Sequence, residues 1–120
     1  MSRDPRKLKV FWQADGLIVS VYAETATFPS QERFGLCAQV RRSAVSVAAN
    51  IVEGCARRTT RDYLHLITVA TGSAAETRYL LDLSSRLGFL KPEVYTRLEP
   101  KYNHLLGGLQ KLINSLDGEP

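Results

Sequence analysis

The chain has 120 residues, of which 44% are hydrophobic and 23% charged, a composition typical of one folded domain and unlike that of a disordered chain. Its 16 Lys and Arg exceed its 12 Asp and Glu, giving a formal net charge of +4 at pH 7, which permits an anionic partner without requiring one. No apolar run approaches the roughly 18 residues of a membrane span, and no apolar segment follows the basic N-terminus as a secretory signal requires. We therefore expect one cytoplasmic domain over residues 1–120, without a membrane partner, in which residues 1–7 and 117–120 are frayed.

The first half of the sequence predicts two helices. The first runs from about Leu8 to Thr27 and stops before Pro29, because the residue preceding a proline disfavours the α conformation. Ser30 is a candidate N-cap, with Glu32 in the first turn of a second helix from about Gln31 to Ala56. Apolar residues at helical spacing predict the buried face of this second helix: Phe34, Cys37, Val40, Ala44, Val47, Ala48, Ile51 and Cys55.

The second half predicts two more helices. Thr59 followed by Asp62 resembles a capping box and opens a third helix from about Thr60 to Leu87. Gly88 then suits the C′ position of that helix, and Pro92 suits the first turn of a fourth. Four amphipathic helices joined by short breaks predict an all-α fold, an antiparallel up-down-up-down four-helix bundle.

Glycines interrupt the third and fourth predicted helices. Gly72 and the pair Gly107-Gly108 each weaken a helix interior by roughly 1 kcal/mol relative to alanine. We interpret them as places where a neighbouring helix approaches closely or where the helix bends, in preference to a ligand site.

The cysteines and histidines indicate no catalytic or metal site. Cys37 and Cys55 lie about 27 Å apart along the second helix, beyond disulfide reach, and belong on its apolar face as small hydrophobic residues. His65 and His104 have no Cys or His at metal-ligand spacing, and no nucleophile or phosphate-binding motif is present. We therefore expect no enzyme activity, no metal, no cofactor and no small-molecule substrate.

A polar stripe runs along the second helix on the side away from its apolar residues. On a helical wheel it comprises Arg42, Ser46, Asn50, Glu53 and Arg57. One interpretation is a solvated face with weak ion pairs, such as Glu53 with Arg57 at i, i+4. The other is a buried polar network between helices or subunits, favoured by Asn50 because asparagine is a mediocre helix former. The candidate members of that network are Arg42, Ser46, Asn50, Glu53 and Glu76. Neither Glu53 nor Glu76 has a histidine three residues on, as carboxylate-bridged metal bundles do.

Basic residues concentrate in two segments. Residues 1–9 hold four basic and one acidic side chain and residues 30–63 hold six basic and three acidic ones, so each segment contributes +3. In an antiparallel bundle the chain start and the break after the second helix lie at the same end, where helix N-termini add backbone donors for phosphate. This end is predicted to be electropositive, and the candidate nucleic-acid contacts are Arg6, Lys7, Lys9, Arg41, Arg42, Arg57, Arg58 and Arg61.

The second helix also carries a family motif. Residues 39–54 read Q-V-R-R-S-A-V-S-V-A-A-N-I-V-E-G. This string is similar to the Q-x-R-R-A-x-x-S-x-x-x-N-I-x-E-G hallmark of a bacterial four-helix-bundle family, the 23S rRNA intervening-sequence proteins, with Ser43 in place of the usual alanine. Ala70, Gly72-Ser73 and Glu76 resemble the family's A-x-G-S-x-x-E pattern, and the resemblance covers about residues 8–90.

This resemblance implies an antiparallel four-helix bundle that assembles with itself, since several relatives are ring-shaped homopentamers. A distant relative of similar fold, the accessory variability determinant of diversity-generating retroelements, binds nucleic acid and a reverse transcriptase through a basic surface. We therefore expect a non-enzymatic homo-oligomer, a pentamer by this resemblance, that binds RNA or DNA through its basic surface. The alternative is an oligomeric adaptor or assembly module that binds no nucleic acid.

Overall fold

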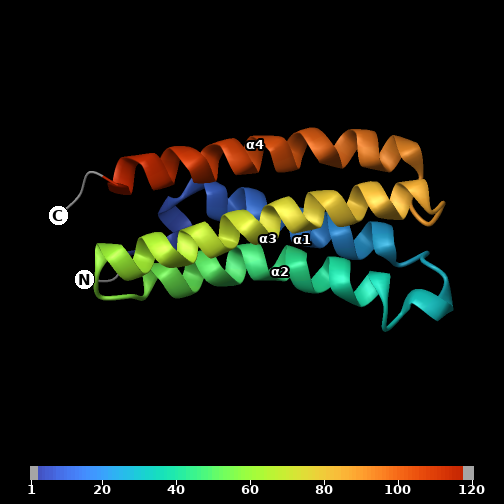
Figure 1. The fold of residues 1–120 in the computed structure, drawn as a ribbon, viewed down its shortest axis with the longest axis horizontal. Coiled ribbons are helices and arrows are strands. Elements are labelled where there is room, and N and C mark those ends of the chain that lie inside the picture. Colours follow the sequence, from blue (N-terminus) through green and yellow to red (C-terminus); the bar gives the residue numbers. More distant parts are fainter. Residues whose placement is uncertain (1–2, 118–120) are drawn as a thin grey trace.

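The computed structural model describes residues 3–117, which form a bundle of four α-helices (Figure 1). The helices are α1 (Lys9–Thr25), α2 (Leu36–Cys55), α3 (Thr60–Arg86) and α4 (Pro92–Asp117); the short 3-10 helices η1 (Pro5–Lys7) and η2 (Ser30–Glu32) precede α1 and α2. The bundle measures 48 × 24 × 19 Å, and the described residues contain no strand. Successive helices run antiparallel, which confirms the predicted up-down-up-down fold. No described helix is long and apolar enough to cross a membrane.

One apolar core lies along the axis of the bundle. Helix α1 packs against α2 and α4, and α3 packs against the same two helices from the other side. All four helices supply fully buried large side chains, among them Val21, Val40, Ile51, Tyr63, Ile67, Leu81, Leu98 and Tyr102. Burial of one such side chain stabilises a fold by about 1.5–3 kcal/mol, so this shared core is the main force that holds the helices together.

The ends of α3 agree with the sequence. The Oγ1 atom of Thr59 accepts a hydrogen bond from the backbone N–H of Asp62 at 3.1 Å, which is the predicted cap. Gly88 follows α3 with a φ of +82°, a left-handed conformation that glycine adopts without strain. Pro92 opens α4, where its missing N–H costs no intrahelical bond.

The start of α2 differs from the sequence prediction. The helix begins at Leu36 instead of Gln31, and Ser30 belongs to η2 instead of capping α2. Glu32 supplies the cap, since its Oε1 accepts from the backbone N–H of Leu36 at 3.1 Å, and Gly35 (φ −104°, ψ −114°) separates the two helices. Phe34 therefore lies outside the regular α2 periodicity and is 88% exposed, so its predicted place in the core was wrong.

The described part of the chain start contacts the rest of the bundle. Residues 3–7, expected to fray, lie against the connection between α2 and α3. The backbone N–H of Arg3 donates to the carbonyl of Cys55 at 2.7 Å, and its guanidinium stacks 4.2 Å from the centre of the Tyr63 ring. At the other end of the chain, Asp117 is the last residue of α4. Residues 1–2 and 118–120 lie outside the described part of the chain.

Gly108 marks the closest approach between α1 and α4. A Cβ at this position would come 2.9 Å from Cγ1 of Val10, so a side chain here would push the two helices apart. This confirms the predicted close approach at the Gly107-Gly108 pair. Gly107 and Gly72 both face open space, so the close-approach interpretation does not extend to them.

Candidate nucleic-acid interface

Arg41, in the first half of the α2 motif, ties α2 to the end of α1. Its Nε donates to Oγ1 of Thr25 at 2.9 Å, its Nη2 donates to the carbonyl of Tyr22 at 3.3 Å, and the guanidinium lies 4.5 Å from the centre of the Tyr22 ring. A half-buried guanidinium with these partners serves helix packing. Arg42, the next residue, is exposed.

Hydroxyl groups of the motif join α2 to α3. Ser46 Oγ and Ser73 Oγ lie 2.8 Å apart, and Asn50 Nδ2 donates to the Oγ and carbonyl oxygen of Ser46. Thr77 Oγ1 donates to Ser43 Oγ at 2.8 Å, one helical turn away. Within the predicted polar stripe, Ser46 and Asn50 thus form a network between helices, and the network includes three residues that the stripe omitted.

The remaining stripe residues are exposed. Glu53 pairs with Arg57 at 2.6 Å in an i, i+4 ion pair, as predicted for a solvated face. Arg42 and Glu76 are also exposed and lie outside the hydroxyl network. The described residues contain no group of three or more His, Cys, Asp or Glu placed to hold a metal ion.

Gly54, the last residue of the motif, makes room for α3. A Cβ there would lie 3.2 Å from Cδ1 of Tyr63 and 3.3 Å from Cβ of Leu66. The neighbouring Cys55 is buried, and burial raises the pKa of its thiol above the ordinary value. Cys37 is buried as well, and both thiols are free, as the sequence predicts for apolar filler.

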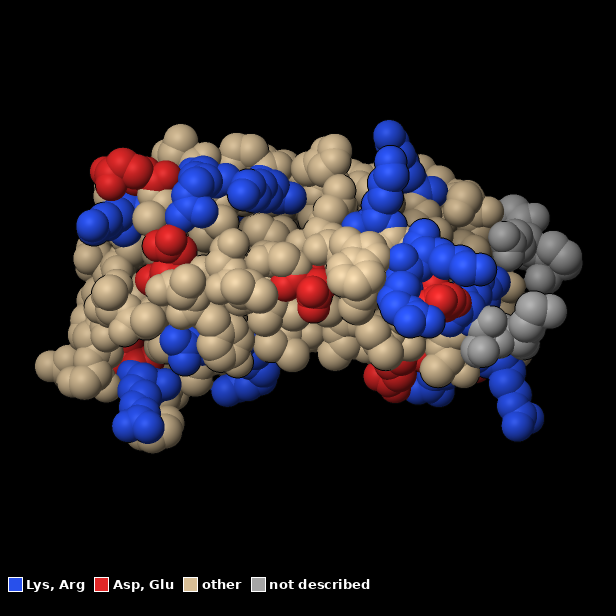
Figure 2. All heavy atoms as spheres, turned by 180° about the vertical axis from the view of Figure 1, so that it is seen from behind, with Lys and Arg blue, Asp and Glu red and all other residues tan. Residues whose placement is uncertain are grey.

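The chain start and the α2–α3 connection lie at the same end of the bundle (Figure 1). Arg3 joins the two segments, because its Nη2 also donates to Thr60 Oγ1 at 3.2 Å. Around this junction stand six exposed cations of the predicted set, which together we call the basic end: Arg6, Lys7, Lys9, Arg57, Arg58 and Arg61. Figure 2 shows Lys and Arg side chains crowded around a few acidic atoms at this end of the molecule.

Acidic neighbours hold Arg6 and Arg57 of the basic end. The Arg6 guanidinium hydrogen-bonds both carboxylate oxygens of Asp4 at 3.1 and 3.2 Å, and these bonds lower the pKa of the Asp4 carboxyl. Arg57 pairs with Glu53. Exposed pairs of this kind contribute little to stability, so the arginines remain available to an anion that offers stronger contacts.

Arg41 and Arg42 do not belong to the basic end. They precede Arg57 by 16 and 15 residues, nearly all of them in the continuous helix α2, which separates them from the basic end by more than about 20 Å. The sequence groups them with Arg57, Arg58 and Arg61 because residues 30–63 together carry an excess of basic charge. Sequence reasoning overlooked Arg3, whose ring-stacked position depends on a contact with Tyr63 that sequence spacing does not reveal.

An apolar strip is exposed on α1 and α2. Trp12 is 54% exposed and Val19 68% exposed on α1, and Val45 and Val52 are exposed on α2. The contact of Arg41 with Tyr22 shows that the exposed faces of the two antiparallel helices adjoin. Exposed apolar groups gathered on one face mark interaction surfaces in soluble proteins.

Residues 6–111 match the sequence family described as 23S rRNA-intervening sequence protein. A solved structure of a protein of unknown function from the S23 ribosomal protein family of Bacteroides thetaiotaomicron is similar in fold, with a TM-score of 0.80 and 24% sequence identity. The similarity covers 87% of this chain and 97% of that one. No curated protein matches the chain. With the family match spanning most of its length, the chain belongs to the 23S rRNA-intervening sequence protein family.

Proposed function

We propose that this protein is a non-enzymatic homo-oligomer that binds RNA or another nucleic acid through the basic end. The observation that carries the proposal is the convergence of exposed cations from two distant segments, residues 6–9 and 57–61, on one end of the bundle. Lysine and arginine side chains neutralise phosphates and release counterions, which supplies most of the affinity in sequence-tolerant binding.

The backbone at this end favours phosphate as well. Helix α3, 27 residues long, begins at Thr60 among the cations of the basic end. The first N–H groups of a helix and the positive end of its dipole attract anions. Thr59 caps the N–H of Asp62, which holds this first turn in place beside the cations.

Self-association would multiply this charge. The exposed apolar strip on α1 and α2 supports contact between copies, and the resemblance noted in the sequence favours five of them. Five copies of a chain with net charge +4 would carry about +20 in total, and a ring would concentrate it on one face. The analogy with the accessory variability determinant of retroelements is in line with this arrangement.

The test removes three cations of the α2–α3 connection together. In the variant Arg57→Ala, Arg58→Ala, Arg61→Ala, we expect weaker binding of single-stranded RNA at low salt and a plot of log affinity against log salt that is shallower by about 2, because each lost phosphate contact removes roughly 0.7 from the slope. Fluorescence anisotropy with a labelled oligonucleotide measures both quantities.

The matched control removes three cations from the opposite end of the bundle, Arg33→Ala, Lys91→Ala and Arg97→Ala. Both variants lose the same net charge, so a specific role of the basic end requires the control to bind as wild type does. Equal losses in the two variants, or no binding by the wild-type protein at low salt, would contradict the proposal.

A second candidate function is an assembly or adaptor module without nucleic acid. The exposed apolar strip favours it, since that surface suits a protein partner as well as a second copy. A stable oligomer in light scattering combined with no RNA or DNA binding at low salt would select this function.

A further inference from the structure

A groove between α1 and α4 is left unused by the proposed contacts at the α2–α3 connection. Two adjoining cavities of about 450 and 520 Å³ lie along it, and Gln13 and His104 line both. Glycines line the groove, Gly16 from α1 and Gly107 from α4, and no atom lies within 4 Å of a Cβ built on either. Each cavity is in the size range of small-ligand sites.

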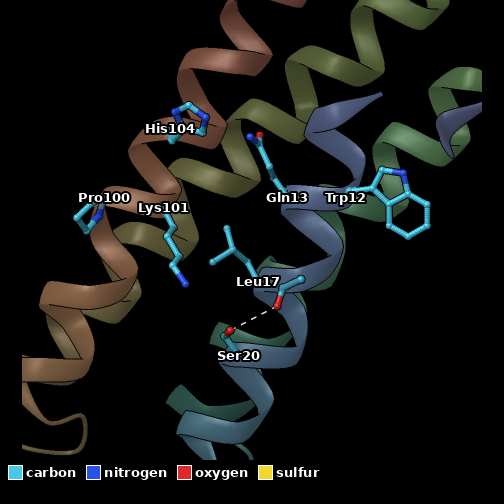
Figure 3. Close-up of a pocket in the computed structure, with 8 residues that line it drawn as sticks. Trp12, Gln13, Leu17, Ser20, Pro100, Lys101 and His104 are labelled. Carbon is cyan, nitrogen blue, oxygen red and sulfur yellow. Dashed lines mark hydrogen bonds between the residues drawn. The ribbon is translucent and has the colours of Figure 1, made fainter. Parts of the chain in front are cut away.

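The groove combines cationic walls with an apolar base. Lys101 lines the first cavity, Lys9 and Lys111 line the second, and neither cavity is lined by a described Asp or Glu. Figure 3 shows Leu17 and Gln13 directed from α1 toward α4, and Lys101 directed from α4 toward α1. Lys9 also belongs to the basic end, so the groove continues that surface along the bundle.

Gln13 holds an unsatisfied polar atom in this groove. Its Oε1 is buried, and no donor among the described residues hydrogen-bonds it. The amide sits beside the backbone of Gly108, where a Cβ would lie 3.7 Å from Oε1. An unpaired buried acceptor is costly, and nearly all such atoms in native proteins have a partner. Gln13 lines both cavities, and because the last torsion of glutamine is soft, rotation of the amide exchanges the positions of Oε1 and Nε2 without any helix moving.

These features define the chemistry of a ligand that would fit the groove. It carries negative charge for the lysines, a flat apolar surface for the base of the groove, and a hydrogen-bond donor for Gln13. An unpaired nucleotide has all three, since the Watson–Crick edge of each base places a donor beside an acceptor, which an amide can match. In a duplex that edge is occupied by the opposite strand.

We propose that the α1–α4 groove receives unpaired bases of a single nucleic-acid strand, with Gln13 hydrogen-bonding a base edge and Lys9, Lys101 and Lys111 contacting the flanking phosphates. This inference rests on the proposed function and refines it from nucleic acid in general to single strands. The cations at the α2–α3 connection attract either form of nucleic acid, whereas the groove distinguishes a single strand from a duplex.

The experiment compares three labelled probes of about 12 nucleotides: single-stranded RNA, the same sequence as a duplex, and an abasic strand with equal phosphate charge. We expect the single strand to bind about tenfold more tightly than the abasic strand, the size of one good base contact. In Gln13→Met, which keeps the length of the side chain and lacks the amide, single-strand affinity falls by about tenfold and duplex affinity is unchanged.

The unfolding midpoint separates this role from a structural one. Gln13→Met removes an unsatisfied buried acceptor, so its midpoint in urea equals or exceeds that of wild type even as binding falls. Gly16→Leu fills the groove and weakens single-strand binding. Gly72→Leu is the matched control, since Gly72 also faces open space but lies on the exposed side of α3, away from the groove.

Three outcomes would overturn the inference. One is equal affinity for all three probes, and another is a Gln13→Met variant that binds single strands as wild type does. The third is a change of oligomer mass in Gly16→Leu and not in Gly72→Leu, which would assign the groove to a second copy of the chain. If the triple arginine variant loses binding while Gln13→Met does not, only this inference fails, and if no probe binds wild type, the proposed function fails with it.

Discussion

At the scale of single residues, Gly54 shows how one missing side chain positions two helices. The buried ring of Tyr63 and the Cβ of Leu66 would stand 3.2 and 3.3 Å from a Cβ at this position, closer than ordinary van der Waals contact. Both neighbours belong to α3, and neither is the far end of a flexible chain. The α2–α3 corner, which presents Arg57 and Arg58, therefore depends on glycine at position 54.

We expect Gly54→Ala to destabilise the protein by about 1 kcal/mol. Alanine gains roughly 1 kcal/mol of helix propensity over glycine, but overpacking a tight contact costs about 1–3 kcal/mol. The control Gly72→Ala gains the same propensity in open space, so it should stabilise the protein by up to about 1 kcal/mol. Urea unfolding of both variants measures the difference, and a Gly54→Ala protein as stable as Gly72→Ala would show that the corner relaxes freely.

At the scale of helices, the α2–α3 interface is held by hydroxyl groups as well as by apolar packing. The Thr77 hydroxyl lies within hydrogen-bond distance of Ser43 Oγ and of the carbonyl of Ser73, both at 2.8 Å. Burial raises the pKa of the Tyr102 phenol on α4, and the Thr77 hydroxyl partly offsets this rise. The Thr77 side chain thereby joins α2 to α3, and directional bonds of this kind fix the register of the two helices.

Removing the Thr77 hydroxyl should destabilise the protein, because the buried group that it hydrogen-bonds loses its partner. In Thr77→Val the shape is kept, but the buried Ser43 Oγ loses the hydrogen bond that Thr77 donates to it, which costs about 1–3 kcal/mol. Ser43→Ala in the same chain removes that stranded acceptor, so the double variant should recover part of the loss. A double-mutant cycle in urea tests this coupling, and strictly additive effects would exclude it.

At the scale of the whole molecule, the proposed contacts fall on three adjoining surfaces. The basic end lies where the chain starts, the groove runs between α1 and α4, and the apolar strip covers the exposed sides of α1 and α2. Trp12 belongs to the strip and also lines the first cavity of the groove, whereas Val45 and Val52 on α2 line neither cavity. A substitution on the α2 side of the strip therefore tests assembly without altering the groove.

Val52→Asp should therefore break assembly without harming the fold. Val52 is exposed in the single chain, so the charge costs little there, whereas burying it between copies is strongly unfavourable. We expect light scattering to report a mass near the 13.4 kDa of one chain at unchanged helicity. The control Val69→Asp places the same charge on an exposed valine of α3 and should keep the oligomer intact. If Val52→Asp leaves the oligomer mass unchanged, the apolar strip does not form the contact between copies.

The fold was predictable to the extent that it depends on local patterns. The cap at Thr59 follows from a hydroxyl close in sequence to the N–H that it accepts from, and the left-handed conformation of Gly88 follows from the absence of a Cβ. The start of α2 did not follow, because a cap at Glu32 and a break at Gly35 compete with an equally plausible cap at Ser30. Phe34 kept helical spacing and still lies outside the helix, since spacing alone cannot locate a boundary.

The sequence by itself determined the four helices, their antiparallel order and the end at which basic residues gather, because these depend on periodicity, short connections and charge along the chain. The tertiary structure decided which polar residues have partners. It assigned Arg41 to helix packing, joined Ser46 to Ser73, and left Oε1 of Gln13 buried with no donor among residues 3–117. Hydrogen bonds are made across helices at distances of about 3 Å, and no pattern along one helix fixes which side chain lies opposite on the next.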